Sequence, residues 1–178
     1  MIQHGVLMNE IGFSPLIDKL LPMVEQLSWD LFPEFVGGSG LDSYKVTKGL
    51  FEKMRFLPLF QAFTIEYDAE TKDHQKDLGT HFDNAEITLN ISLTDDHDGG
   101  ELYFVRWAGH THDRMIVIMI IRNDKFIPVE HKKGQGVLHL GQEMHGAMPL
   151  ATGRRTNLII WFRSSSVRNM ECPMCSWY

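Results

Sequence analysis

A histidine and an aspartate lie one residue apart in the stretch GTHFDNAEITLNISL, which spans residues 79–93. On an extended chain, residues i and i+2 point in the same direction, so His81 and Asp83 would direct an imidazole and a carboxylate toward one point. Two further ligands would complete a closed zinc-type site. One further histidine would give the two-histidine, one-carboxylate face that holds non-haem Fe(II). An isolated His-X-Asp also occurs in surface turns and helix caps, so other residues must show whether this one belongs to a metal site.

The candidate third ligand is His145, in the stretch EMHGAMPL, 64 residues after His81. It follows GVLHL, a segment with strand-like alternation, and 64 residues are enough for several strands to return to the same end of a barrel. A zinc hydrolase is an alternative, and it would need a general base beside the metal. Glu143 is close to His145 in sequence and is the candidate for that base.

Arg155 follows ten residues after His145 and opens the stretch RTNLIIWF. Strand alternation places Arg155, Asn157, Ile159 and Trp161 on one face, and the more apolar set Thr156, Leu158, Ile160 and Phe162 on the other. An arginine at the head of such a strand suggests a cation directed into a pocket. A guanidinium binds carboxylates bidentately, so a dicarboxylate ligand fits best. The alternative is an exposed arginine, which is our interpretation of Arg154.

Polar residues alternate with apolar ones along residues 86–94. We expect Asn90 and Ser92 to face the same interior as Asp83, where a polar cosubstrate would lie. The apolar set of this strand would pack outward against helices; it consists of Ile87, Leu89, Ile91 and Leu93. Tyr67, in the neighbouring segment FTIEY, either offers its hydroxyl to the same ligand or lies at the edge of the core.

The elements that must position these side chains begin with a helical N-terminal third. Ser14 followed by Pro15 is typical of a helix start, with the serine as cap. An apolar stripe follows at three- and four-residue spacing, formed by Leu16, Leu20, Val24, Leu27 and Leu31. Pro22 predicts a kink or two abutting helices, and the glycines of residues 33–40 predict a loop.

From Phe63 onward the hydrophobic period changes to two. Strand-like segments follow one another, separated by glycine or polar turns: FTIEY, EITLNISLT, GGELYFV, MIVIMII, GQGVLHL and RTNLIIWF. Helices first and then several short strands without helical crossovers indicate an α+β, mainly β fold, in which helices brace a sandwich or barrel.

Composition restricts the functional class further. The 178 residues match one domain with a sizeable core, and the net charge of −6 gives no reason to expect a nucleic-acid partner. The start lacks the features of a signal peptide, and the apolar run at residues 115–121 is too short to cross a bilayer, so we expect an intracellular protein without a membrane association. Cys172 and Cys175 form one CPMC pair, which fits a reducing compartment better than a disulfide framework.

The ordered motifs HFD, TLNISL, GGELYF, GQGVLHLG and HGAMPLATGRRTNLIIWF resemble the 2-oxoglutarate- and Fe(II)-dependent dioxygenases of the prolyl-hydroxylase-like group. The resemblance covers nearly the whole chain. It implies a double-stranded β-helix, or jelly roll, braced by N-terminal helices within a single domain of residues 1–178. We assign residues 1–62 to helical support, residues 63–165 to the jelly-roll core and residues 166–178 to a C-terminal tail.

The same resemblance implies roles for individual residues. His81, Asp83 and His145 match the iron ligands, and Arg155 matches the residue that pairs with the distal carboxylate of 2-oxoglutarate. Further cosubstrate contacts are expected at these positions: Tyr67, Asn90, Asn157, Trp161 and Leu102. The implied cofactors are Fe(II), 2-oxoglutarate and O2, with ascorbate as a possible reductant. The implied reaction is hydroxylation of a C–H bond, with a peptidyl proline or lysine favoured and with succinate and CO2 as co-products.

Two matters stay open in the sequence. Residues 46–61 are not expected from the family, and they represent either a helical insertion or the translation of an unspliced intron. Relatives carry a substantial extra N-terminal part, so the chain can also be a truncated form. A catalytically silent jelly-roll module that binds a metal, a dicarboxylate or a protein partner is therefore the alternative function. The sequence does not indicate an oligomeric state.

Overall fold

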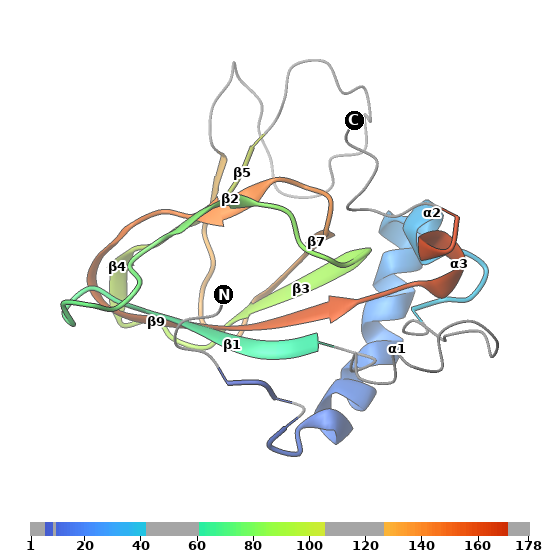
Figure 1. Cartoon of the computed structure of the whole chain (residues 1–178), viewed down its shortest axis with the longest axis horizontal. Helices are drawn as coiled ribbons and strands as arrows, with labels where there is room; N and C mark the ends of the chain where they lie inside the picture. Colours follow the sequence, from blue (N-terminus) through green and yellow to red (C-terminus); the bar gives the residue numbers. More distant parts are fainter. Residues whose placement is uncertain (1–5, 9, 42–60, 106–126, 171–178) are drawn as a thin grey trace.

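The computed structural model describes residues 6–8, 10–41, 61–105 and 127–170, and within them antiparallel strands predominate (Figure 1). The helices are α1 (Ser14–Leu31), α2 (Pro33–Val36) and α3 (Ser165–Arg168). The strands are β1 (Gln61–Asp68), β2 (Leu78–His81), β3 (Ile87–Ser92), β4 (His97–Gly99), β5 (Leu102–Phe104), β6 (Ile127–Val129), β7 (Gly136–Leu140), β8 (His145–Ala147) and β9 (Leu150–Phe162). Among these residues, no helix is long and apolar enough to cross a membrane.

Two sheets enclose the interior. The major sheet has the order β1-β9-β3-β7, with β4 paired to the first part of β9, and the minor sheet has the order β2-β8-β5-β6. The strands named here pair in antiparallel fashion, which agrees with a chain that returns through turns rather than helical crossovers. The predicted α+β, mainly β class is confirmed.

The helices cover the outer face of the major sheet (Figure 1). Alternation along β3 and β9 creates this division, since one set of side chains packs against the helices and the other faces the minor sheet. The predicted outward set of β3 is confirmed for Ile87, Leu89 and Ile91, which belong to or pack against the helix-side core. That core is completed by residues of both layers: Met8, Ile17, Val24, Phe32, Val36, Leu41, Ala62, Leu158, Ile160 and Phe162.

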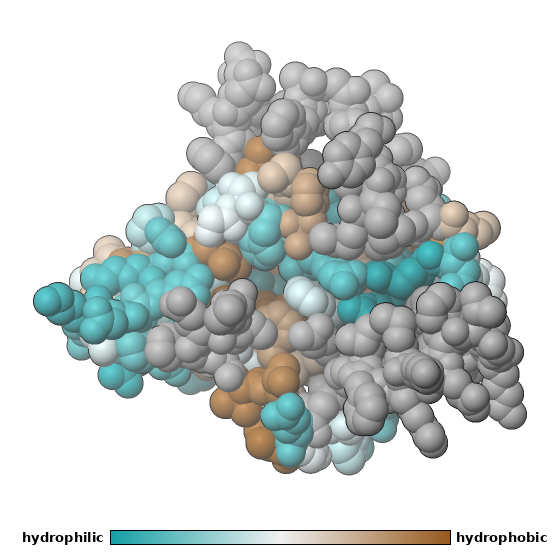
Figure 2. Space-filling view, in the orientation of Figure 1, coloured by the Kyte–Doolittle hydropathy of each residue, from teal (hydrophilic) through white to brown (hydrophobic). Residues whose placement is uncertain are grey.

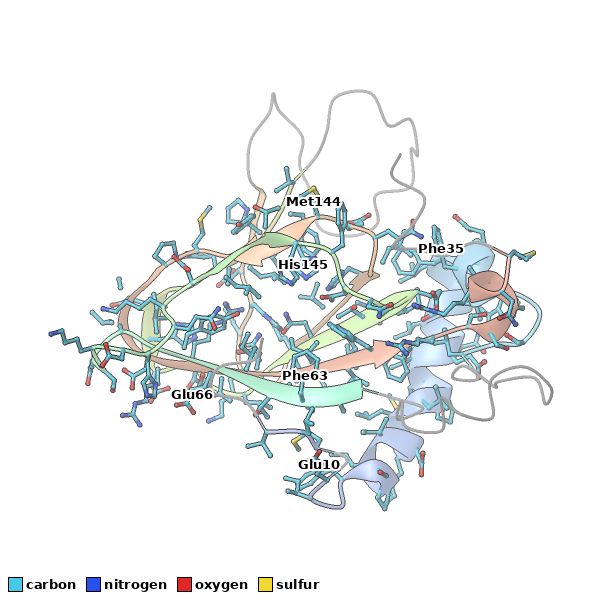
Figure 3. The ribbon with its side chains drawn as sticks, in the orientation of Figure 1. Glu10, Phe35, Phe63, Glu66, Met144 and His145 are labelled. Atoms are coloured by element: carbon cyan, nitrogen blue, oxygen red, sulfur yellow. The ribbon has the colours of Figure 1, made fainter. Side chains whose placement is uncertain are left out.

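Side chains of the opposite parity fill the space between the sheets. Phe63 and His145 both point into it, whereas Glu66 lies on the outside of β1 (Figure 3). On the face shown in Figure 2, hydrophilic residues gather at the left, over the β1–β2 connection and β4. Hydrophobic residues gather at the base, over the segment that leads into α1, where Ile11 and Phe13 are exposed.

The predicted apolar stripe of α1 is partly wrong. Leu16 and Leu27 are 43% and 51% exposed, whereas Ile17 and Val24 are only 2% and 5% exposed. Both sets of residues are apolar and lie at helical spacing, so spacing alone did not fix the stripe that meets the sheet. The observed stripe is centred on Ile17, Val24 and the buried Ser28, whose hydroxyl donates to the Val24 carbonyl oxygen over 2.7 Å.

Three further local predictions for this region are corrected. The cap residue of α1 is Phe13 rather than Ser14, and it accepts backbone hydrogen bonds at the start of the helix without a side-chain cap. The helix runs through Pro22 as one element rather than as two abutting helices, and a kink at Pro22 stays a prediction. Within the predicted loop at residues 33–40, the first four residues form α2.

Arg155 does not lie at the head of its strand, because β9 already begins at Leu150. The pairing of His97 in β4 with Gly153 keeps this earlier part of β9 in the sheet. Several predictions lie outside the described residues: the character of residues 46–60, the strand at residues 115–121, and the roles of Cys172 and Cys175. The division of the chain into support, core and tail stays a prediction.

Asp68 closes the β1–β2 connection. Its carboxylate accepts hydrogen bonds from the Glu70 and Thr71 backbone N–H groups and from the Thr71 hydroxyl, and it lies 2.9 Å from Arg154 Nε. The Thr71 hydroxyl is the largest influence on the carboxyl group and, with the Glu70 N–H, holds the pKa of Asp68 at about 2. A carboxyl group whose pKa is lowered by folding stabilises the fold when it is ionised.

The contrast between Leu16 and Ile17 tests the observed helix face. Ile17→Ala is expected to lower the free energy of unfolding by about 2–5 kcal/mol, since it leaves a cavity under the sheet. Leu16→Ala is expected to change it by no more than about 0.5 kcal/mol, as an exposed substitution usually does. Urea titration of both variants measures this, and equal losses would show that α1 packs through a different face.

Asp68→Asn should destabilise the fold at neutral pH, because the amide cannot supply the ionised acceptor that Thr71 and Arg154 meet. Since the folded pKa is depressed, this stability is present above the unfolded pKa of about 4 and is lost as the pH falls toward about 2. Thermal melting of wild type and variant from pH 7 to pH 3 should show the difference shrinking. A difference in melting temperature that does not depend on pH would show that the charge of Asp68 does not stabilise the fold.

Candidate metal centre

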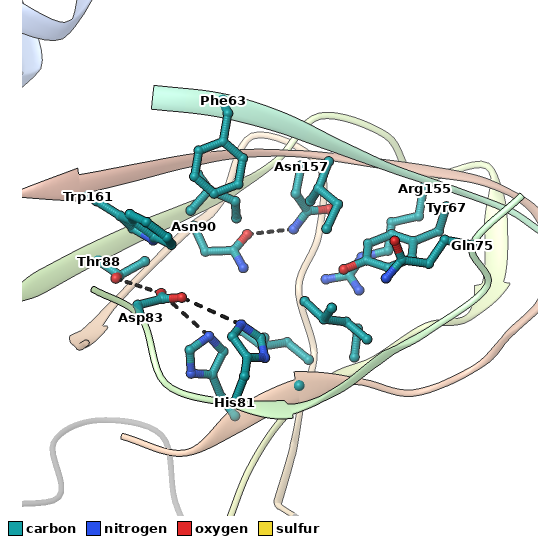
Figure 4. A pocket seen from close by; sticks show the side chains of 17 residues that line it. Phe63, Tyr67, Gln75, His81, Asp83, Thr88, Asn90, Arg155, Asn157 and Trp161 are labelled. Carbon is teal, nitrogen blue, oxygen red and sulfur yellow. Dashed lines mark hydrogen bonds and ion pairs between the residues drawn. The ribbon is translucent and has the colours of Figure 1, made fainter. Parts of the chain in front are cut away.

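Side chains from two paired strands, β2 and β8, and from the turn after β2 meet at one end of the cavity between the sheets. His81 Nε2 lies 3.5 Å from Asp83 Oδ1, and His145 Nε2 lies 3.5 Å from Asp83 Oδ2. The potential ligand atoms of the three residues all lie within 4.8 Å of one another. β2 and β8 pair with His81 directly opposite His145, which brings together residues far apart in sequence. The sequence-predicted triad therefore converges (Figure 4).

Backbone carbonyls orient both imidazoles. His81 Nδ1 lies 2.9 Å from the Gly79 carbonyl oxygen, and His145 Nδ1 lies 2.7 Å from the Glu143 carbonyl oxygen. A carbonyl only accepts, so each Nδ1 carries the proton and each Nε2 is left with a free lone pair directed at the shared point. Such outer contacts are those that metal-bound histidines usually make. The donor set thus fits a divalent metal such as iron.

For Asp83 and His145, the electrostatics favour the protonation states that a metal requires. Burial would raise the pKa of Asp83, but the contact with His81 and the nearby His145 overcome it and lower that pKa to about 2. Burial lowers the pKa of His145, so its imidazole is neutral near pH 7. The side chains of His145 and Asp83 are 6% and 4% exposed, whereas His81 is 33% exposed and marks the open side of the centre.

Asp83 reaches the cavity because the strand is interrupted. β2 ends at His81 and β3 begins at Ile87, so Asp83 lies on a turn between them. Asn90 is seven residues beyond Asp83, and on one continuous strand the two would face opposite sides. The prediction that Asn90 faces the same interior as Asp83 is right, since both residues line the cavity. The turn, rather than strand alternation, brings the Asp83 side chain to that side.

Thr88 stabilises the carboxylate from the next strand. Its hydroxyl donates to Asp83 Oδ2 over 2.7 Å, and Thr88 lines the cavity with 1% of its surface exposed. Sequence reasoning missed this residue, although its alternation with Asn90 on β3 was a usable signal. The hydrogen bond from Thr88 therefore holds the Asp83 carboxylate in an orientation that faces the two histidines.

The cavity extends from the triad to Arg155 and has a volume of about 200 Å³. Of the predicted cosubstrate residues, Tyr67, Asn90, Asn157, Trp161 and Leu102 all line it, as Arg155 does. Gln75, from the β1–β2 connection, lies at the Arg155 end beside Tyr67 (Figure 4). Sequence reasoning missed Gln75 and had no periodic signal for it, since it lies in a loop.

Arg155 is buried, and within the part of the chain that the structure describes it forms no ion pair. It is 2% exposed, and among the described residues no carboxylate lies within 4.0 Å of its guanidinium. One of its nitrogens, Nη1, donates to the Gly100 carbonyl oxygen, and its Cζ lies 5.7 Å from the Tyr67 ring centroid. Gly100 has a φ of +74°, and its missing side chain leaves room beside the arginine. Arginine stays charged in proteins, so the cavity holds an unpaired cation.

Burial raises the pKa of Tyr67, which is paired opposite Arg155 in the sheet, so its hydroxyl stays protonated and able to donate. Between Arg155 and the triad, Asn157 Nδ2 donates to Asn90 Oδ1 over 2.5 Å. Asn157 Oδ1 has no hydrogen-bond partner among the described residues. This amide pair gives the middle of the cavity a polar floor.

Two predictions at the site are corrected or limited. Ser92 is buried but does not line the cavity, because its hydroxyl turns to the Thr94 carbonyl oxygen at 3.0 Å. Glu143 is not among the residues that line the cavity, and its observed contribution is the backbone carbonyl that orients His145. The general base that a zinc hydrolase would need is therefore not supplied by Glu143.

Comparisons with known proteins agree with this geometry. The chain is 39% identical over 180 residues to the 2-oxoglutarate and iron-dependent oxygenase domain-containing protein 2 of Xenopus tropicalis, and 38% identical over 181 residues to that of Mus musculus. Each match covers 98% of this chain and 42% of the relative, so the chain spans less than half the length of these relatives. No protein-family model matches the chain.

Among solved structures, a prolyl 4-hydroxylase of Phytophthora capsici aligns with 92% of this chain and 48% of its own chain, at a TM-score of 0.51 and 13% identity. At that identity the likeness concerns the fold, and it supports the predicted jelly roll. Sequence and fold together identify the chain as a homologue of the 2-oxoglutarate and iron-dependent oxygenase domain-containing proteins.

Proposed function

We propose that this chain is an Fe(II)- and 2-oxoglutarate-dependent dioxygenase that hydroxylates a C–H bond of a peptidyl proline or lysine. The observation that carries the proposal is the unpaired Arg155 guanidinium in the same cavity as His81, Asp83 and His145. A metal triad alone fits several chemistries. A buried cation facing it across the cavity adds the need for an anion that also reaches the metal, and a 2-oxo diacid meets both requirements.

The residues of the chain would divide the work along the cavity. The two Nε2 atoms and the Asp83 carboxylate would hold the iron, with Thr88 fixing the carboxylate. Arg155 would pair with the distal carboxylate of 2-oxoglutarate, and the Tyr67 hydroxyl would donate to the same group. When bound, iron and 2-oxoglutarate supply the oxidising chemistry, in which O2 is used and succinate and CO2 are released.

The remaining lining residues would shape and dry the site. Leu102 and Trp161 are apolar walls of the cavity, and Phe63 packs edge-on against Trp161 with ring centroids 5.2 Å apart. Asn90 and Asn157 would position the cosubstrate between the two charged ends. The more exposed His81 marks the side from which a protein or peptide substrate would approach. Ascorbate would act as a reductant rather than a substrate.

The direct experiment is turnover of 2-oxoglutarate by the purified chain with added Fe(II), with succinate measured. Succinate formation that requires both Fe(II) and O2 supports the proposal. A protein that binds metal and 2-oxoglutarate but forms no succinate, with or without candidate peptides, would instead support the silent binding module.

His81→Ala and Asp83→Ala are expected to abolish iron-dependent succinate formation, because each removes one of three converging ligands. His97→Ala is the control, since His97 lies on β4 and does not line the cavity. Wild-type succinate yields from either ligand variant, in protein that keeps its circular dichroism spectrum, would exclude these residues as ligands.

Arg155→Ala is expected to weaken 2-oxoglutarate binding by about 10- to 150-fold, which corresponds to the roughly 1.5–3 kcal/mol of a hydrogen bond to a charged group. Arg154→Ala is the matched control, because the neighbouring side chain is 62% exposed and pairs with Asp68 instead. Calorimetric titration of Mn(II)-loaded protein measures both. Equal affinities of the two variants would contradict the assignment.

A further inference from the structure

Beyond the cavity, the turn that carries Asp83 is held by side chains from the C-terminal end of the fold. Residues 82–86 connect β2 to β3, and α3 follows directly after β9 on the side where β3 begins (Figure 1). The sequence motif HFDNAE contains, after the aspartate, an asparagine and a glutamate to which neither the metal nor the cosubstrate gives a role.

Arg168 of α3 contacts both of these residues. Its Nη1 donates to Asn84 Oδ1 over 2.7 Å, and its Nη2 lies 2.8 Å from Glu86 Oε1. The side chain of Glu86 is fully buried and that of Arg168 is 13% exposed, so the pair is shielded from water. A buried charge that loses its partner is strongly unfavourable, and this ties the turn to α3.

Other contacts close the turn from the remaining sides. Arg163 Nε donates to the Asn84 carbonyl oxygen over 3.2 Å, and the Ser164 N–H donates to Glu86 Oε2 over 2.8 Å. Opposite them, the Asp83 N–H donates to the Gly141 carbonyl oxygen over 2.8 Å. A Cβ at Gly141 would overlap the carbonyl oxygen of Ala85, so a glycine is needed for this close approach.

α3 is itself anchored to the helical layer. The Ser166 N–H donates to Ser39 Oγ over 3.0 Å, and the Ser164 hydroxyl donates to the Val36 carbonyl oxygen over 2.5 Å. α3 thus connects α2 and the loop after it to the turn that bears Asp83. Neither Arg163 nor Arg168 lines the cavity, so neither would touch iron or cosubstrate.

We propose that Arg168 is a positioning residue for the metal centre, which acts by holding the turn of Asn84 and Glu86 so that the Asp83 carboxylate stays between His81 and His145. The inference rests on the proposed function only in that the triad binds metal. Outer residues that orient metal ligands typically change metal affinity by about 10- to 100-fold when they are removed.

The test compares Mn(II) affinity, measured by calorimetry, in four variants of the full chain. Arg168→Met should weaken binding by about 10- to 100-fold, and Arg168→Lys, which keeps the charge but not the fork geometry, should recover part of it. Asn84→Ala, which leaves the Glu86 ion pair intact, should weaken binding less than Arg168→Met. Ile17→Ala, a destabilising change in the remote helix-side core, should bind Mn(II) within about twofold of wild type.

Hydrogen exchange in the metal-free protein gives a readout that does not depend on metal. Arg168→Met should accelerate exchange of the Asp83 and Glu86 amides more than that of the central β9 amides, whereas Ile17→Ala should not show this local preference. Wild-type Mn(II) affinity in folded Arg168→Met and Asn84→Ala would overturn the inference. If wild-type protein binds no Mn(II), the proposed metal centre fails. In that case, an equal effect of Arg168→Met on the exchange of the turn amides and the β9 amides would also overturn the role of Arg168 in holding the turn.

Discussion

The rest of the site depends on a buried guanidinium, that of Arg155, which has no carboxylate in contact among the described residues. Arg155 is 2% exposed, and its observed contacts are a backbone carbonyl and the face of Tyr67. Neither neutralises its charge, and burial of an uncompensated charge is costly. Arg155 lies at one end of a cavity, and the other end holds the Asp83 carboxylate between the imidazoles of His81 and His145. With a divalent metal bound to that triad, a diacid would pair one carboxylate with Arg155 and reach the metal with its other end.

The architecture makes this arrangement possible by assigning alternate residues to different tasks. On β9, Leu158, Ile160 and Phe162 seal the sheet against the helices, while Arg155 and Asn157 face the cavity. Hydrophobic packing on one face therefore fixes the direction of the polar groups on the other. The minor sheet supplies His145 through β8, and the pairing of β2 with β8 sets it opposite His81. The candidate metal centre thus lies beside the β2–β8 pair, in the cavity that faces the well-packed major sheet.

Much of this could be predicted from the sequence, because it depends on period and on residue chemistry. The division of β9 into two faces followed from alternation, and the convergence of His81, Asp83 and His145 followed from the ordered motifs. Alternation failed where the chain is not extended, since Asp83 lies on a turn and Ser92 bonds to its own loop. It also failed on α1, where Leu16 and Ile17 are equally apolar and the sheet alone decides which is buried. The roles of Gln75, Thr88 and Arg168 depend on neighbours that are distant in sequence. No local sequence pattern predicted the contacts of Arg168.

The proposed site requires that a metal and a diacid bind together in the cavity. A crystal structure of the chain with Mn(II) and 2-oxoglutarate, using anomalous scattering to locate the metal, tests this in one measurement. The account predicts a single strong peak in contact with His81 Nε2, Asp83 and His145 Nε2, and the distal carboxylate of the diacid on the Arg155 guanidinium. A metal bound elsewhere, or a cosubstrate that leaves Arg155 unpaired, would contradict it.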